Sequence, residues 1–184
     1  MHTNRRLLLS RDQPIITTYH EAGHAVMAMA NGFTVTRITN VSSDVGQGHV
    51  IWQTPDPPTT ASRIGSILVF ASGMAADFIH WQQNGTDEHE VSLGHQDDRR
   101  QAGIHLRELG EDSQFDVYLG IAIHFLRRHD VWEWVEGFAD LMTAAGTIDG
   151  QQLIHRAFLK VPKIGSAELD HLKLALDMSK RGLL

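Results

Sequence analysis

Two histidines four residues apart, His20 and His24, are the residues of this sequence best placed to do chemistry. In a helix, a four-residue step puts both imidazoles on one face, one turn apart, so that both can bind one metal ion. Glu21 follows the first histidine, beside that ion, where it can take a proton from the attacking water and return it to the leaving amine. The HExxH pattern therefore predicts a metallopeptidase with two histidine ligands and a glutamate base.

A third metal ligand has to come from another part of the chain, because a catalytic zinc normally keeps three protein ligands and one open position. The sequence has no cysteine. Met27 and Ala30 stand where the extended HExxHxxGxxH motif has its glycine and third histidine. The candidates are Asp98 and its neighbour Asp97, near the start of a predicted helix. Acids in a first turn also stabilise the helix N-terminus, so the residues alone leave both roles open.

Other acids and histidines are weaker candidates. Asp77 and His80 would share one face of a helix. The acidic run at 87–90 could bind a metal weakly, but its composition is more typical of a solvated loop. The remaining candidates are expected on the surface, or in the core with satisfied hydrogen bonds: His49, His105, His124, His129, His155 and His171. With twelve histidines in the chain, a fortuitous motif on an ordinary helix is an alternative.

The element that carries the motif is predicted as a helix over 14–31. Its apolar residues recur at three- and four-residue steps, Pro14 lies in the first turn and Asn31-Gly32 ends it. Residues 33–41 and 48–53 are rich in β-branched types and predict a hairpin, the only β structure expected.

The rest of the chain is predicted to be helical. Thr59 or Thr60 can cap an apolar helix that runs to about residue 82. After a polar loop at 84–94, further helices are expected at about 95–109, 113–129, 131–145, 149–159 and 166–180. Residues 1–12 are expected to be a flexible tail. The fold class predicted for 1–184 is a single, mainly α domain with a small β hairpin or sheet, of the helical HExxH zinc-peptidase type.

Composition limits the classes of partner. The chain has 184 residues, 42% of them hydrophobic, which suits one domain. A net charge of −6 without long runs of one sign gives no footprint for nucleic acid or a polybasic membrane patch. The longest apolar stretch, 67–76, is interrupted and short, so no membrane insertion is expected. The absence of cysteine fits a reducing compartment, and a soluble, cytoplasmic protein is predicted.

Several segments match one family in the same order. The first is Tyr19-His20-Glu21-Ala22-Gly23-His24-Ala25. The others are residues 35–39, 48–50 with 53–55, 72–77, 96–102 and 148–153. On these segments the chain, from about residue 13 to 155, resembles the peptidase domain of the FtsH-type membrane-anchored AAA zinc metalloproteases.

The resemblance implies that His20 and His24 bind one Zn²⁺ per chain, with Glu21 as the base. It also implies that Asp98, rather than its neighbour, is the third ligand. A small β element with an edge strand is implied as well, and an extended peptide could pair with that edge through main-chain hydrogen bonds. The predicted strand at 33–40 suits that role.

The sequence also departs from the family pattern. Met74 stands where the family usually has arginine, and Asp97 and Arg99 replace the residues typical beside the metal aspartate. The chain has no GxxxxGK[ST] motif, and with no predicted membrane span it is expected to lack both the ATPase and the anchor of the family it resembles.

The predicted function is that of a zinc-dependent metallopeptidase that works without ATP on flexible or unfolded polypeptides. A homo-oligomer or a separate ATPase is a possible partner. One alternative is a catalytically inactive binding or regulatory module that keeps the fold. The other is a purely structural helical protein.

Overall fold

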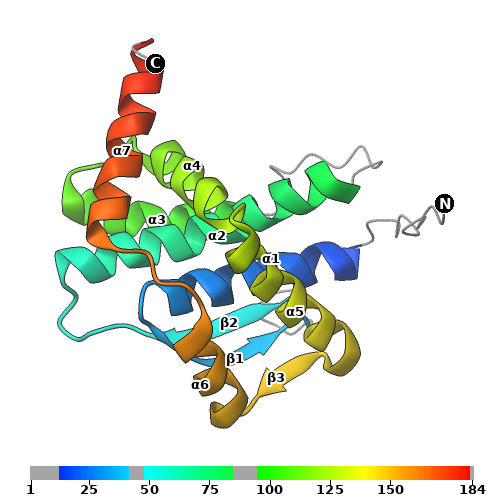
Figure 1. The fold of residues 1–184 in the computed structure, drawn as a ribbon. Coiled ribbons are helices and arrows are strands. Elements are labelled where there is room, and N and C mark those ends of the chain that lie inside the picture. Colours follow the sequence, from blue (N-terminus) through cyan, green and yellow to red (C-terminus); the bar gives the residue numbers. More distant parts are fainter. Residues whose placement is uncertain (1–12, 42–47, 85–94, 183–184) are drawn as a thin grey trace.

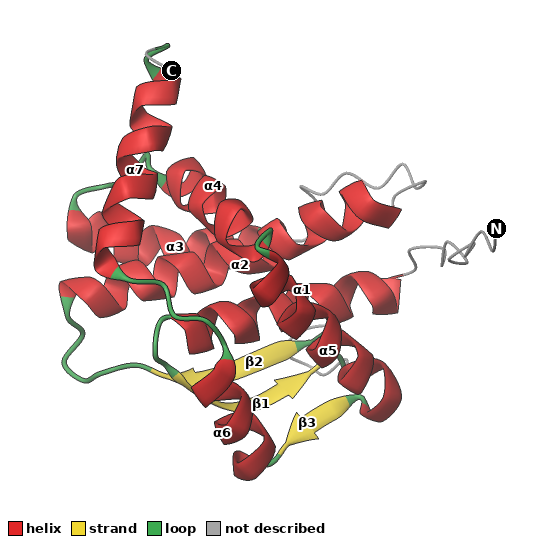
Figure 2. Ribbon diagram, viewed as in Figure 1, coloured by secondary structure: helices red, strands yellow, loops and turns green. Residues whose placement is uncertain are grey.

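The computed structural model describes residues 13–41, 48–84 and 95–182. These residues form seven helices and one small antiparallel sheet (Figures 1 and 2), which confirms the predicted mainly α class. The elements in chain order are α1 (Gln13–Ala30), β1 (Thr34–Thr39), β2 (His49–Gln53), α2 (Thr60–Asn84), α3 (Gln96–Leu109), α4 (Phe115–Leu126), α5 (His129–Ala145), β3 (Thr147–Asp149), α6 (Gln151–Lys160) and α7 (Ser166–Lys180). The predicted tail at 1–12 and most of the predicted loop at 84–94 lie outside the described residues.

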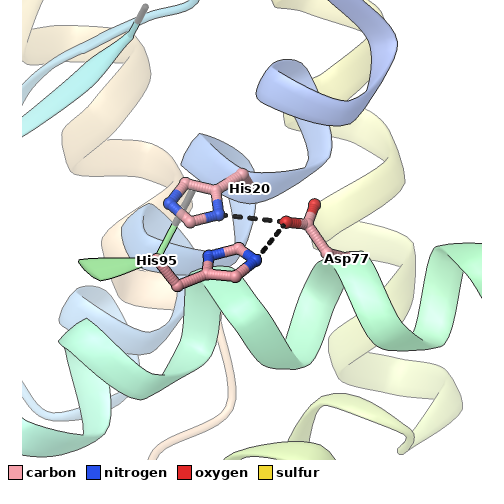
Figure 3. A group of neighbouring side chains, drawn as sticks. All are labelled: His20, Asp77 and His95. Carbon is pink, nitrogen blue, oxygen red and sulfur yellow. Dashed lines mark hydrogen bonds and ion pairs between the residues drawn. The ribbon is translucent and has the colours of Figure 1, made fainter. Parts of the chain in front are cut away.

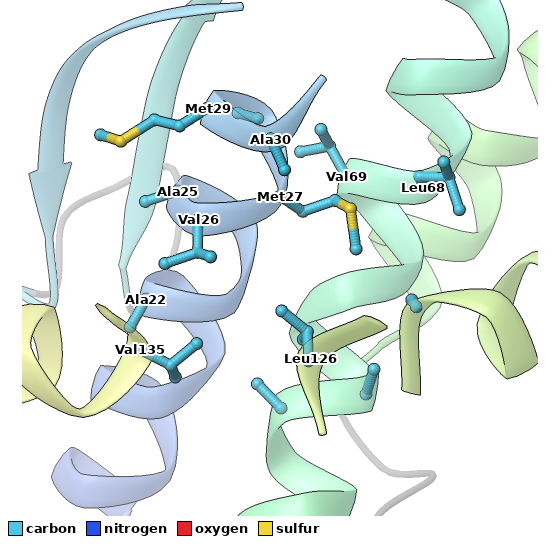
Figure 4. Close-up of a cluster of buried hydrophobic side chains, with 14 of the residues drawn as sticks. Ala22, Ala25, Val26, Met27, Met29, Ala30, Leu68, Val69, Leu126 and Val135 are labelled. Carbon is cyan, nitrogen blue, oxygen red and sulfur yellow. The ribbon is translucent and has the colours of Figure 1, made fainter. Parts of the chain in front are cut away.

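Helix α1 is the centre of the molecule. The sheet lies on one side of it, and α2 on the other, with α3 and α4 beyond α2 (Figure 1). The apolar residues of its C-terminal half are fully buried, among them Val26, Met27 and Met29. Figure 4 shows Met27 between α1 and α2, near Val69 of α2. Since burial of one such side chain stabilises a fold by about 1.5–3 kcal/mol, the motif helix is held rigidly by the core.

Small residues let α1 and α2 approach closely. A Cβ added at Gly23 would lie 2.6 Å from the Ser72 carbonyl oxygen and 2.6 Å from Ala76 Cβ. Neither atom is the end of a flexible side chain, so a larger residue here would push the helices apart. The glycine inside the motif therefore brings α2 up against the two histidines.

Helix α2 begins as predicted, at a threonine cap. The Ser62 amide donates to Thr59 Oγ1 at 3.1 Å, and the Thr59 amide donates to Ser62 Oγ at 2.8 Å, a reciprocal capping arrangement. The helix is longer than the apolar stretch seen in the sequence and, by length and composition, could cross a membrane. However, 72% of its apolar window is buried inside the protein, which is consistent with the central helix of a soluble protein.

The sheet extends one sequence prediction and corrects another. Its order is β2-β1-β3, both pairs antiparallel, and Ile38 in the middle strand pairs with Val50 on one side and Ile148 on the other. The predicted antiparallel pair of β1 and β2 is present, and β3 adds a third strand that the sequence had not indicated. The prediction that 33–40 forms the edge was wrong, because β1 is the central strand. Among the described residues no strand covers the outer edge of β2.

Candidate metal centre

Three side chains converge on one point beside α1. The Nε2 atoms of His20 and His24 are 3.0 Å apart, and one oxygen of Asp98, Oδ2, lies 3.1 Å from the first and 3.4 Å from the second. The histidines come from neighbouring turns of α1, and Asp98 comes from the first turn of α3. The structure thus brings together the three residues that the motif and the resemblance had singled out as ligands.

The other nitrogen of each imidazole fixes where its proton is. His24 Nδ1 lies 2.6 Å from the Val69 carbonyl oxygen, which can only accept, so His24 must carry its proton there. His20 Nδ1 lies 3.2 Å from an oxygen of Asp77, and it too acts as the donor. In neutral imidazoles both Nε2 atoms then present lone pairs to each other and to the Asp98 oxygen. Only added protons or a cation can hold such a group together.

The donor set fits a divalent metal ion. Ligand atoms placed about 2.0–2.2 Å from a tetrahedral zinc are roughly 3.3–3.6 Å from one another, and the separations of 3.0, 3.1 and 3.4 Å seen here are close to that range. Two neutral imidazoles and one carboxylate are also a common set of zinc ligands, with one position left open. The residues present can therefore hold a metal ion.

Space for an ion is kept by a glycine of α2. A Cβ added at Gly73 would lie 2.6 Å from His24 Nε2 and 2.7 Å from His20 Nε2. Any side chain there would occupy the volume in front of both lone pairs. The position of Gly73 therefore explains why this residue of α2 must lack a side chain.

The two neighbouring aspartates of α3 have different surroundings. Asp98 points to the histidines, with 18% of its side chain exposed. Asp97 has 71% of its side chain exposed and pairs with Arg100, whose Nε lies 3.1 Å from it. Neither makes a side-chain cap, since the residue in the N-cap position is His95. Of the two candidates, only Asp98 reaches the histidine pair.

The pKa values reflect the same clustering of groups. Burial lowers the pKa of His20, but its hydrogen bonds to Asp77 and Asp98 raise it well above the usual value. Burial also lowers the pKa of His24, and the charge of Asp98 outweighs this. The pKa of Asp98 lies far below its usual range, because His24 and His20 outweigh the effect of burial. Positive charge between these groups is therefore strongly favoured.

Glu21 is a buried acid next to this cluster. Its exposed fraction is only 6%, and burial raises its pKa, an effect that the charges of His24 and His20 partly reverse. A Cβ added at Gly48 would lie 2.9 Å from both Cγ and Oε1 of Glu21. The chain just before β2 thus passes directly against the predicted base, and the outer edge of that strand begins beside the site.

A second group lies on the far side of the His20 ring. Oδ2 of Asp77 is 3.2 Å from His20 Nδ1 and 3.3 Å from His95 Nε2 (Figure 3). The rings of His20 and His95 are stacked, with centroids 5.0 Å apart. These three residues are also close enough to hold a metal ion. Sequence reasoning had considered Asp77 with a different partner and had not singled out His95.

The remaining candidates lie away from both groups. His80, the expected partner of Asp77, stacks on Tyr19 at 3.8 Å between ring centroids, and neither metal-capable group of the described residues includes it. The run at 87–90 lies outside the described residues. Four of the remaining six histidines are exposed, in agreement with the prediction: His124, His129, His155 and His171. His49 and His105 are half-buried, and the Nδ1 atom of each is buried without a hydrogen-bond partner among the described residues, so neither is a satisfied core residue.

Comparison with known proteins adds no family to this description: searches of protein-family models and of curated proteins found no match.

Proposed function

We propose that the protein is a zinc-dependent metallopeptidase that hydrolyses peptide bonds in flexible or unfolded polypeptides. The observation that carries the proposal is the convergence of the Nε2 atoms of two imidazoles and a carboxylate oxygen on one point, with a buried glutamate beside them. His20, His24 and Asp98 would hold one Zn²⁺ per chain, which suits their nitrogen and oxygen donors. The sequence resemblance to FtsH-type peptidases supports the same assignment.

Each residue has a defined part in this reaction. A bound zinc would supply a Lewis acid that polarises the scissile carbonyl and makes water more acidic. Glu21 accepts the proton of the attacking water and then gives it to the leaving amine. Its burial and raised pKa suit a group that must take up and release a proton near neutral pH. His24 and His20 keep their protons on Nδ1, so their Nε2 atoms stay available as ligands.

The substrate would be an extended peptide. Strand β2 begins next to Glu21, and its outer edge is not covered by another described strand. A peptide that adds to this edge would be held by main-chain hydrogen bonds, which tolerate many sequences. Most of the backbone of a folded domain is already hydrogen-bonded within that domain, so flexible or unfolded segments are the expected substrates. A cytosolic location and cooperation with a separate ATPase or with further copies of the chain are compatible with this role.

The decisive experiment replaces the base and keeps the ligands. We expect Glu21→Gln to retain zinc, measured by elemental analysis, and to cleave casein at least about 100-fold more slowly than the wild type. Glu133→Gln, at an exposed glutamate of α5, is the matched control and should be fully active. Unchanged cleavage by Glu21→Gln would remove Glu21 from the mechanism.

A noncatalytic binding module is the second candidate, and one contact favours it. Two of the positions that depart from the family pattern touch each other next to the site: Nη2 of Arg99 lies 3.6 Å from Sδ of Met74, and the same guanidinium stacks on Phe115 at 4.4 Å. Residues that depart from the family pattern thus lie together close to Asp98. A zinc-loaded protein that binds peptides but leaves a broad peptide library intact would support this candidate.

A further inference from the structure

We propose that His95 is a positioning residue for the metal ligand His20, acting through Asp77 and by stacking on the His20 ring. The inference rests on the proposed metal site and deepens it. It concerns the side of the imidazole that faces away from the ion, where a hydrogen-bonded carboxylate commonly fixes the ring of a histidine ligand.

The carboxylate of Asp77 lies within hydrogen-bond distance of two imidazoles. Both imidazoles meet the same oxygen, Oδ2, at 3.2 Å from His20 Nδ1 and 3.3 Å from His95 Nε2. The other oxygen, Oδ1, has no hydrogen-bond partner among the described residues. Asp77 is 97% buried, since only 3% of it is exposed, so water cannot replace a lost partner. Its carboxylate is therefore held in place by two imidazoles, one of which is the metal ligand.

The rings of His20 and His95 are also stacked on each other. The planes of His20 and His95 are inclined by only 21°, with 5.0 Å between the centroids (Figure 3). His95 is itself buried, with 4% exposed, and it covers one face of the ligand ring. Rotation of the His20 side chain would have to displace it. Hydrogen bond and stack together restrict the direction in which His20 Nε2 points.

His95 is also close in the chain to the third metal ligand. It immediately precedes α3, three residues before Asp98. A single turn therefore delivers both the third ligand and the residue that holds Asp77 against the first ligand. The group joins α1, α2 and α3 on the far side of the ring, just as the ligands join α1 and α3 on the near side.

The same three residues could instead be ligands of a second ion. That arrangement would require His20 to lose its Nδ1 proton as well, because both ring nitrogens would then bind metal. As a positioning group the cluster needs no such step, because His20 and His95 each donate one hydrogen bond to the same oxygen of Asp77. The number of ions bound per chain separates the two arrangements.

The test uses Co²⁺, whose visible absorption reports the geometry of the ligands, on the full chain without any peptidase assay. The affinity is measured by competition with a chelator. We expect His95→Ala to weaken Co²⁺ binding about 10- to 100-fold, as loss of groups behind metal ligands usually does, and to alter the visible spectrum. His95→Gln, whose amide can still donate to Asp77, should recover most of the affinity. His155→Ala, at an exposed histidine of α6, is the matched control and should be unchanged.

The outcomes are distinguishable. If the wild type binds one ion and His95→Ala binds it equally tightly with the same spectrum, the role of His95 is overturned while the metal site stands. If the wild type binds two ions and His95→Ala only one, the cluster is a second metal site and the positioning role is overturned. If the wild type binds none, the proposed function fails, and this inference with it. Should His95→Ala not fold, a His95→Gln variant with an affinity as low as that of Asp77→Ala would also overturn the proposal.

Discussion

The two sides of the His20 imidazole differ in what they need. On the Nε2 side, His24 and Asp98 present only lone pairs, at 3.0 and 3.1 Å. On the Nδ1 side, Asp77 accepts hydrogen bonds that His20 and His95 can donate. The first side is complete only with a cation, whereas on the second side the protein itself supplies both the donors and the acceptor. Removal of a group from the first side should weaken metal binding much more than removal from the second.

The largest expected effect is on the Nε2 side. His24→Ala removes one of the two nitrogen ligands, and the remaining pair cannot hold an ion alone. We expect no stoichiometric metal in the purified variant, measured by elemental analysis, and no cleavage of casein. A variant that still carries one tightly bound ion would show that the ligand set is different.

Asp98→Ala should come next. We expect the affinity for Zn²⁺ to fall by more than about 100-fold, beyond the range typical for groups behind the ligands. Asp97→Ala is the control in the adjacent position, and it should bind zinc as the wild type does, because its side chain faces solvent and Arg100. Equal effects of the two substitutions would mean that the charge of the segment matters, and not the position of one carboxylate.

The pH dependence of metal binding tests the same side. The pKa values of His20 and His24 lie above the usual value in the metal-free protein, despite burial, because of Asp77 and Asp98. A raised pKa keeps each ring protonated to higher pH, and those protons compete with the ion. Affinity should therefore decrease as pH falls, starting above the usual histidine pKa of about 6.5. A decrease of about tenfold per pH unit is expected for each proton displaced, and an affinity independent of pH would contradict it.

The smallest effect is expected for a second substitution on the Nδ1 side, made in a variant that already lacks the Asp77 carboxylate. If His95 acts mainly through Asp77, the substitution His95→Ala should cost little in an Asp77→Ala background, less than about threefold in Co²⁺ affinity. The double-mutant cycle is measured by chelator competition. Fully additive losses would show that the two residues support His20 independently.

The Nε2 side could be predicted from the sequence, because most of its residues are close together in the chain. The spacing of His20, Glu21 and His24 within one helix is enough to place their side chains together. Asp98 was reached by the need for a third ligand and by the resemblance, and the structure brings it to the histidines. The fold class was accessible for a similar reason, since strong helical periodicity runs through most of the chain.

The Nδ1 side was not reached, because its residues meet only through tertiary packing. Asp77 and His95 have no spacing that signals a contact, and the acid had been compared with His80, its neighbour on the same helix. The sheet shows the same limit. A three-residue strand between two helices, Thr147–Asp149, has too few positions to display alternation, and no local pattern tells which strand of a sheet is central. The edge was therefore assigned to 33–40 and not to β2.

The ligands of the proposed ion lie on helices that are far apart in the chain, α1 and α3. An ion between them would act as a cross-link, closing a long loop and restricting the unfolded chain much as a disulfide does. Metal loading and folding would then be linked equilibria. Chelation should consequently loosen the first turn of α3 before the α1–α2 core, and amide hydrogen exchange would report this as a protection lost at one end of one helix.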